Sequence, residues 1–323
     1  MKLWIRVVFS AAVLAVLFTV LPWNEVRHAV ATMPIGRWLA ILALFLVGHQ
    51  VGVVKWRLMV NAGRASLRLA DAVRCYAAGL FANLCLPSIV GGDVLRAALA
   101  GRATRRPEAV AWGGIADRYL DVVALGSLIL AGAALNRGRF PAWGARLLVV
   151  VFAILIGGAV VTLVTIWRVP LHRWPRRVRR PIGRSLVAMR RMARAPSAAL
   201  AALALAITIQ GGFVLLNAWI GQGVGIAVPA SVWFLVWPLA KLAALAPISL
   251  NGLGVRDATQ GALLLSMGVP AASGVVASLL WQSVLIGGGL AAGGLWWSMG
   301  RRRAAGSPSR PGDVLPLFWS RSG

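Results

Sequence analysis

LPSIVGGDVLR at residues 86–96 and APISLNGLGVRD at residues 246–257 are the two interruptions of apolar sequence that decide the fold. Each runs from a proline through glycines to a neighbouring arginine and aspartate, and in each the arginine stands nine positions after the proline. Hydrocarbon tolerates neither irregular backbone nor isolated charge, so such breaks persist where protein buries them or where they line a polar cavity. We therefore expect a substrate to bind at the two breaks.

The composition places the rest of the chain in a membrane. Hydrophobic residues make up 59% of the 323 positions and charged residues only 13%, whereas a soluble domain is about one quarter charged. A membrane-spanning helix needs about 20 mainly apolar residues. The stretches that approach this length are Trp4–Trp23, Trp38–Val54, Ala72–Val90, Tyr119–Leu135, Leu147–Trp167, Ala199–Gly221, Val232–Ala246 and Ala271–Met299. The sequence predicts an all-α polytopic membrane protein with about eight hydrophobic segments.

The basic residues are clustered, and their placement predicts the orientation in the membrane. The formal net charge is +26, and the arginines and lysines gather in Lys55–Arg74, in Arg168–Arg194 and in the tail from Arg301. Loops rich in arginine and lysine stay in the cytoplasm and attract anionic lipid headgroups. No aromatic-interleaved or helix-turn-helix pattern accompanies the charge, so we expect no nucleic-acid partner.

These anchors require both breaks to be re-entrant. The first two spans would return the chain to the cytoplasm at Lys55, and a full crossing by Ala72–Val90 would then export the Arg168–Arg194 loop. We expect the chain instead to enter as far as Pro87, turn at the glycines and return. The segment Asp257–Gly268 is too short to span the bilayer, so it is expected to pair with the broken segment before it.

Two broken helices at corresponding places predict two related halves with a site near the middle of the membrane. We expect a membrane domain over residues 1–300, with halves of about 1–167 and 195–300 joined by a basic cytoplasmic loop over 168–194. Residues 301–323 are expected to form a short, basic, disordered tail. The sequence leaves open whether the repeat is inverted. The expected location is the bacterial inner membrane, with both termini in the cytoplasm.

Three motifs carry a resemblance to a known family: Pro-Ser-x-x-Gly-Gly-Asp-x-x-Arg at Pro87–Arg96, the Asp117-Arg118 pair, and the break at Pro247–Asp257. They resemble the transmembrane domain of lysylphosphatidylglycerol synthases, over Met1 to Arg303. The chain departs from the family at Asn251, where glycine is frequent, and at Asp257, where glutamate is common. The family's synthases carry a large soluble transferase domain, and here a short tail follows the last span. The resemblance thus implies the flippase-like part without aminoacylation.

The physics of lipid translocation gives the charged residues a role. A phosphate that crosses the membrane needs a partner at each depth, because an isolated buried ion costs several kcal/mol. Arginine binds phosphate oxygens bidentately and stays charged when desolvated. Arg96 and Arg256 would receive the phosphate of an anionic phospholipid or a polyprenyl-phosphate-linked lipid, together with free N–H groups at the broken helix ends. Asp93 and Asp257 would pair with the arginines or contact a cationic headgroup.

The predicted substrate-binding residues belong to the two breaks, the Asp117-Arg118 pair and one lysine within an apolar segment. They are Pro87, Ser88, Gly91, Gly92, Asp93, Arg96, Asp117, Arg118, Lys241, Pro247, Ser249, Asn251, Gly252, Gly254, Arg256 and Asp257. Lys241 is included because an uncompensated lysine in a membrane helix costs about 2.5–3.5 kcal/mol on insertion scales.

Structural alternatives compete with each assignment. The breaks are also explained as packing kinks, and the two arginines as members of structural Arg–Asp pairs. Asp117, Arg118 and Asp121 are placed at a helix start, where acidic residues favour the helix dipole. Among functions, a membrane scaffold or accessory subunit for a lipid-modifying enzyme, and an intramembrane lipid transferase, remain alternatives to flipping. No catalytic or metal-binding motif is found, so we expect a transporter rather than an enzyme, with no cofactor, metal or catalytic residue.

Overall fold

The computed structural model describes residues 33–86, 91–136, 142–168, 176–244 and 254–306, and within these ranges it contains ten helices and no strand. This confirms the all-α prediction. The helices are α3 (Ile35–Ala62), α4 (Leu69–Cys85), α5 (Gly91–Thr104), α6 (Pro107–Leu135), α7 (Ala142–Arg168), α8 (Arg176–Ala193), α9 (Pro196–Gly223), α10 (Ala230–Ala244), α11 (Val255–Leu265) and α12 (Ala271–Gly306). The expected span at Trp4–Trp23 lies outside the described residues.

Within the described ranges, four helices are long and apolar enough to cross a bilayer: α3, α6, α9 and α12. The shortest of them has 28 residues, which corresponds to about 42 Å at 1.5 Å per residue and exceeds the roughly 30 Å of hydrocarbon. Shorter apolar helical segments lie at Phe152–Arg168 within α7 and at α10. The chain is therefore a multi-pass membrane protein, as predicted.

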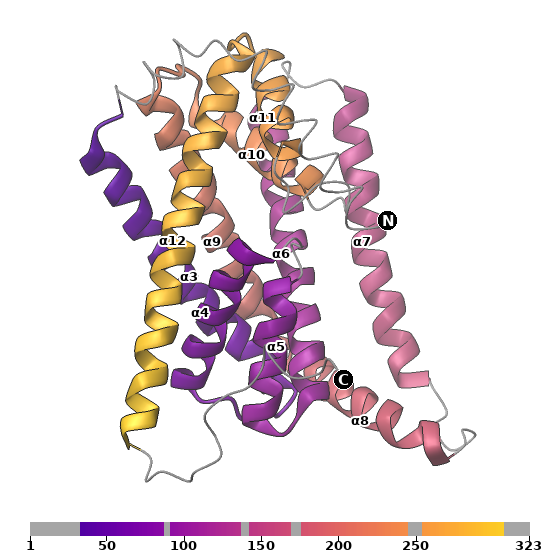
Figure 1. Ribbon diagram of the computed structural model, residues 1–323. Helices are drawn as coiled ribbons and strands as arrows, with labels where there is room; N and C mark the ends of the chain where they lie inside the picture. Colours follow the sequence, from indigo (N-terminus) through magenta and orange to yellow (C-terminus); the bar gives the residue numbers. More distant parts are fainter. Residues whose placement is uncertain (1–32, 87–90, 137–141, 169–175, 245–253, 307–323) are drawn as a thin grey trace, which may run out of the picture.

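The long helices belong to two groups with the same order of elements. In α3–α6 and in α9–α12, a long helix is followed by two short helices and a second long helix. The groups run in opposite directions: Met33 before α3 lies against Gly223 at the end of α9, and Gly48 of α3 lies against Phe213 of α9. Consequently, α4 and α5 occupy one half of the bundle and α10 and α11 the other half (Figure 1). The second group is inverted relative to the first.

Each pair of short helices packs against the other group's long helix. Helix α4 lies against α12, and α10 lies against α6. Glycines bring these helices together: Gly132 of α6 contacts Leu235 of α10, while Gly289 of α12 contacts Leu84 of α4. Small residues are the usual means by which membrane helices approach closely. The two groups therefore interlock.

Four sequence-based expectations are corrected by the helix boundaries. The expected basic loop over 168–194 contains helix α8. Its arginines alternate with apolar residues such as Leu186 and Ala188, which are buried, so the charge run is one face of an amphipathic helix. Helix α3 continues beyond Lys55, the expected point of return to the cytoplasm, and α12 extends into the expected tail as far as Gly306.

The fourth correction concerns α6, which begins at Pro107 rather than near Asp117. Proline at the first helical position and Glu108 in the first turn are the ordinary signals of a helix start. Asp117, Arg118 and Asp121 therefore lie inside a 29-residue helix, and the helix-dipole explanation for them is wrong. Asp121 stands at the midpoint of α6, at a depth where charge needs a partner.

Candidate functional site: a buried ion network

Charged side chains from four helices and one glutamine meet in the middle of the bundle. The residues are Lys55 of α3, Asp93 and Arg96 of α5, Asp117, Arg118 and Asp121 of α6, Gln210 of α9 and Lys241 of α10. Gln210 stands at the midpoint of α9, as Asp121 does in α6. We call this set the ion network. It joins helices from both groups of the inverted repeat.

Lys55 is held by two carboxylates of α6. Asp117 and Asp121 are four residues apart, which places them on one face of the helix. The Lys55 Nζ lies 2.9 Å from Asp117 Oδ1 and 2.6 Å from Asp121 Oδ1. The lysine side chain is only 4% exposed, so this charge is fully removed from solvent. Removing either partner would leave a buried ion incompletely compensated.

The α5 side of the network contains two arginines that share Asp93. Arg118 donates two hydrogen bonds to the Asp93 carboxylate, from Nε at 2.7 Å and from Nη2 at 2.6 Å. Arg96 Nη2 lies 3.2 Å from Asp93 and 3.5 Å from Asp117. The Arg118 side chain is 52% exposed whereas that of Arg96 is 5% exposed. The network is thus closed around Arg96 and open at Arg118.

Aromatic faces hold the buried Arg96 on its other sides. Its guanidinium carbon lies 4.5 Å from the ring centroid of Trp56 on α3 and 4.8 Å from that of Tyr76 on α4. Cation–π contacts of this kind are worth about 0.5–2 kcal/mol. Tyr76 Oη also lies 3.3 Å from His49 Nδ1, beside a cavity of about 150 Å³ between α3, α4 and α12. Aromatic and ionic contacts together fix the position of Arg96.

Lys241 is the cation of the network that has no carboxylate partner within the described residues. Its Nζ donates a hydrogen bond of 2.8 Å to Gln210 Oε1, and Gln210 Nε2 donates in turn to Asp121 at 3.2 Å. The ammonium lies over the rings of Trp237 at 4.7 Å and Phe213 at 5.8 Å. The buried indole N–H of Trp237 also lacks an acceptor among the described residues. Two donors therefore remain without an anion near the end of α10.

Counting charges in the ion network gives a surplus of one positive charge. Lys55, Arg96, Arg118 and Lys241 face three carboxylates, those of Asp93, Asp117 and Asp121. The carboxylate of Asp121 is connected to Lys241 only through Gln210, which bridges the two side chains. A buried surplus charge is costly unless a counter-ion approaches it. An anion beside Lys241 would balance this surplus.

The second break forms a separate cluster at the start of α11. Arg256 donates to Asp257 at 3.1 Å, to Ser278 Oγ at 3.2 Å and to Gln282 Oε1 at 2.9 Å. Asp257 accepts further hydrogen bonds from Ser278 and from the N–H of Gly254, the latter at 3.0 Å. This set, which we call the α11 cluster, carries one positive and one negative charge. It is balanced, compact and confined to the start of α11 and to α12.

The glycines of the two breaks serve different geometric purposes. Gly254 has φ of +80°, a left-handed conformation that strongly favours glycine. Gly92 has instead a packing role, because its N–H donates to Asn83 Oδ1 at 3.0 Å and a Cβ there would overlap the Gly79 carbonyl oxygen of α4. Gly91, at the start of α5, lies against the side chain of Leu86, which follows the end of α4. The α4–α5 pair therefore depends on close backbone approach.

The structure thus brings five of the predicted site residues into the ion network: Asp93, Arg96, Asp117, Arg118 and Lys241. It places Gly254, Arg256 and Asp257 in the α11 cluster. Both expected Arg–Asp pairs are present, at 3.2 Å for Arg96 and at 3.1 Å for Arg256. The remaining predicted residues that lie outside the described ranges are Pro87, Ser88, Pro247, Ser249, Asn251 and Gly252.

Sequence reasoning missed three members of the network. Lys55 was counted with the basic cluster that follows it, although a purely apolar Val-Gly-Val-Val precedes it at residues 51–54. Asp121 was assigned to a helix start, although its spacing from Asp117 is that of neighbours on one helical face. Gln210 carries no charge and lies in an apolar run, so no signal in the sequence distinguishes it from a packed polar residue.

These observations define a class: polytopic α-helical membrane proteins with an inverted repeat and a buried ion network at its centre. Comparison with protein families narrows the class. The model of the lysylphosphatidylglycerol synthase TM region matches residues 3–293, so the chain belongs to this family and the expected resemblance is confirmed. Comparisons with curated proteins and with solved structures gave no match. Family membership connects the chain with membrane lipids.

Proposed function

We propose that the protein moves an anionic phospholipid or a lipid-linked precursor across the bilayer, and that the lipid phosphate binds at the ion network. The observation that carries this proposal is the surplus positive charge at Lys241, which is partly buried within the bundle and has no carboxylate partner among the described residues. A phosphodiester carries one negative charge and would neutralise the network. Lysine and arginine are both suited to phosphate oxygens.

An opening in the network supports access for a lipid. Arg118 lies well inside α6, yet its side chain is 52% exposed, while Lys55 and Arg96 are enclosed. An arginine exposed to hydrocarbon at this depth is costly, so a polar group is expected to cover it during function. A headgroup that enters from the side would meet Arg118 first and Lys241 deeper in the network. The acyl chains would remain in the bilayer.

The inverted arrangement supports movement between the two leaflets. The α4–α5 pair and the α10–α11 pair occupy opposite halves of the bundle, and we propose that both are re-entrant (Figure 1). Each break then faces one leaflet, with the ion network between them. Inverted repeats with broken helices at a midplane site are the general architecture of alternating access. Small tilts of the two pairs would open the network to one side at a time.

The arginines gather at one end of the bundle, and this supports a particular orientation of the protein in the membrane. Arg102, Arg105 and Arg106 lie at the same end of the bundle as α8, whose sequence is rich in arginine. We call this the arginine-rich end and propose that it faces the cytoplasm of a bacterial inner membrane. Helix α12 also ends there, which supports a cytoplasmic C-terminus. Because α3 starts at the opposite end, one further span before it would place the N-terminus in the cytoplasm as well.

The test is transbilayer movement of fluorescent short-chain anionic phospholipids in proteoliposomes that contain the purified full chain. We expect wild-type movement, and a loss of at least about tenfold in Lys241→Met, because methionine keeps the shape and removes the surplus charge. Lys241→Arg should retain substantial movement. Arg68→Met, at an exposed position before α4, is the matched control and should behave as wild type.

The outcomes separate the candidate functions. Movement that is unchanged in Lys241→Met, with equal protein incorporation, contradicts a role for the surplus charge. Absence of movement by the wild type across a panel that includes a polyprenyl phosphate contradicts flipping and favours the scaffold or transferase alternatives.

A further inference from the structure

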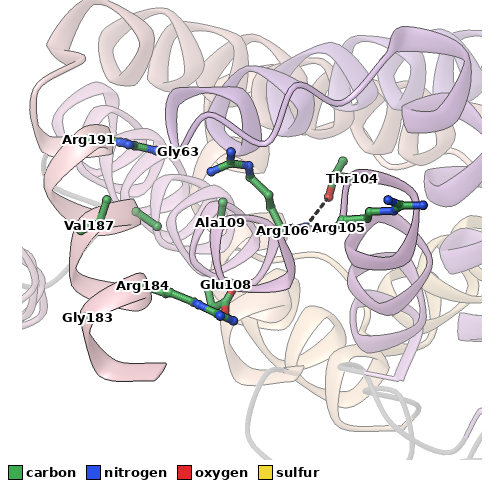
Figure 2. Close-up of a pocket in the computed structure, with 11 residues that line it drawn as sticks. Gly63, Thr104, Arg105, Arg106, Glu108, Ala109, Gly183, Arg184, Val187 and Arg191 are labelled. Atoms are coloured by element: carbon green, nitrogen blue, oxygen red, sulfur yellow. Dashed lines mark hydrogen bonds and ion pairs between the residues drawn. The ribbon is translucent and has the colours of Figure 1, made fainter. Parts of the chain in front are cut away.

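A large pocket at the arginine-rich end is separate from the ion network. It has a volume of about 690 Å³ and lies between α8 on one side and the α5–α6 corner on the other (Figure 2). Its charged lining residues are Arg105, Arg106, Glu108, Arg184 and Arg191. Glu108 precedes Asp117 by nine residues on α6, a separation of roughly 14 Å along the helix. The pocket therefore lies near the end of the bundle.

The charges around this pocket are not balanced. Among the described lining residues the single carboxylate is that of Glu108, and Arg184 Nη1 lies 3.4 Å from its Oε1. Figure 2 shows Arg191 of α8 and Arg106 before α6 pointing toward one another across the pocket, and neither forms an ion pair within the described residues. Two facing guanidinium groups repel each other unless an anion lies between them. The geometry fits a small anion with several acceptor oxygens.

The wall that carries Arg191 is held in place by specific contacts. Arg190 Nε donates to the Ile166 carbonyl oxygen near the end of α7 at 3.0 Å. The guanidinium carbons of Arg190 and Arg194 lie 5.7 Å and 4.9 Å from the ring centroid of Trp167. These contacts orient α8 relative to α7 and leave Arg191 free to face the pocket. The site is therefore pre-organised by neighbours that do not line it.

We propose that this pocket binds a phosphate-bearing anion between Arg106 and Arg191. At the membrane–water boundary two sources share this chemistry: the headgroup of an anionic phospholipid in the adjacent leaflet, and a soluble phosphate. The site is independent of the proposed translocation, since it shares no residue with the ion network. A tightly bound headgroup would link α8 to the α5–α6 corner.

The experiment measures binding by isothermal titration calorimetry with the full chain in a neutral detergent. The probes are dihexanoyl phosphatidylglycerol, inorganic phosphate and, as the zwitterionic comparison, dihexanoyl phosphatidylcholine. The pocket variant is Arg106→Ala combined with Arg191→Ala. The control variant, Arg68→Ala combined with Arg102→Ala, removes the same charge from exposed positions at the same end that do not line the pocket. Unchanged melting temperatures establish that both are folded.

We expect the pocket variant to bind dihexanoyl phosphatidylglycerol about tenfold more weakly than wild type, and the control variant to stay within about twofold. Equal weakening in both variants would overturn the proposal in favour of a diffuse electrostatic attraction. Wild-type affinity in the pocket variant would overturn it as well. Because Lys241→Met removes the anion site proposed in the ion network, binding that is lost in Lys241→Met and kept in the pocket variant would assign the lipid to the ion network and overturn the proposal.

The titration with inorganic phosphate shows whether the bound anion is a lipid headgroup or a soluble phosphate. If inorganic phosphate displaces the lipid and loses affinity in the pocket variant, the phosphate group alone is recognised and a soluble anion can occupy the site. If it does not compete, the glycerol and chains contribute and the site is specific for lipid. Because Lys241→Met tests translocation and the pocket variant tests this site, failure of one proposal is distinguishable from failure of the other.

Discussion

The two breaks have nearly the same sequence pattern, but their arginines are held in different ways. Arg96 lies in a network that reaches five helices besides α5 when its aromatic contact with α4 is included, and the network carries a surplus positive charge. Arg256 lies in the α11 cluster, where Asp257 balances its charge and Ser278 and Gln282 complete its hydrogen bonds. The two breaks therefore share a motif, but their arginines have different surroundings. The proposal of an anion site at the ion network therefore rests on the difference in charge balance and not on the motif.

The largest effect is expected from Asp117→Asn, which tests whether the ion network behaves as one unit. Asp117 contacts both Lys55 at 2.9 Å and Arg96 at 3.5 Å, so its neutralisation leaves two buried cations short of a partner. Loss of one member of a buried pair costs about 3–5 kcal/mol. We expect a loss of this size in the free energy of unfolding, measured by reversible unfolding in mixed micelles.

The control for this prediction is the double variant Lys55→Met with Asp117→Asn. It removes one cation together with one anion, so it should be more stable than Asp117→Asn alone. A double variant as unstable as the sum of the two single variants would contradict direct coupling between the two side chains.

A smaller effect is expected from Gly92→Ala, which tests the packing at the first break. The added methyl group would overlap the Gly79 carbonyl oxygen and force α4 away from α5. Overpacking of this kind costs about 1–3 kcal/mol. Gly212→Ala in α9 is the control, since a Cβ there meets nothing within 4 Å and alanine favours the helix. Equal melting temperatures for the two variants would contradict a close α4–α5 contact.

The helical segments and the positions of the two breaks were predictable from the sequence. Hydropathy located the helical segments, because the bilayer restricts a span to long apolar helices. Proline, glycine and charge together located both breaks. The partners of the charges were not predictable, because Lys55, Asp121 and Lys241 come from three helices far apart in sequence. Helix α8 was missed because a run of arginines looks like a loop until its apolar face is counted.

Ser278→Ala tests the α11 cluster, where we expect a loss of stability without a loss of function. Ser278 donates to Asp257 and accepts from Arg256, so alanine removes two hydrogen bonds within a cluster that keeps its Arg–Asp pair. Hydrogen bonds between membrane helices are worth about 0.6 kcal/mol on average and reach about 1.7 kcal/mol. The expected loss is therefore about 0.5–2 kcal/mol. A tenfold fall in lipid movement per folded molecule would show instead that the second break binds the substrate too.

The smallest effect is expected from Tyr76→Phe, at the residue whose ring covers Arg96 in the first break. No aromatic ring lies over Arg256 among the described residues, so this contact distinguishes the two arginines directly. Tyr76→Phe keeps the ring face and loses only the long hydrogen bond to His49 at 3.3 Å, so its unfolding free energy should fall by less than about 1 kcal/mol. Tyr76→Leu removes the face as well and should cost a further 0.5–2 kcal/mol or so. If both variants unfold alike, the aromatic ring contributes nothing to holding Arg96, and the ionic partners alone account for its position.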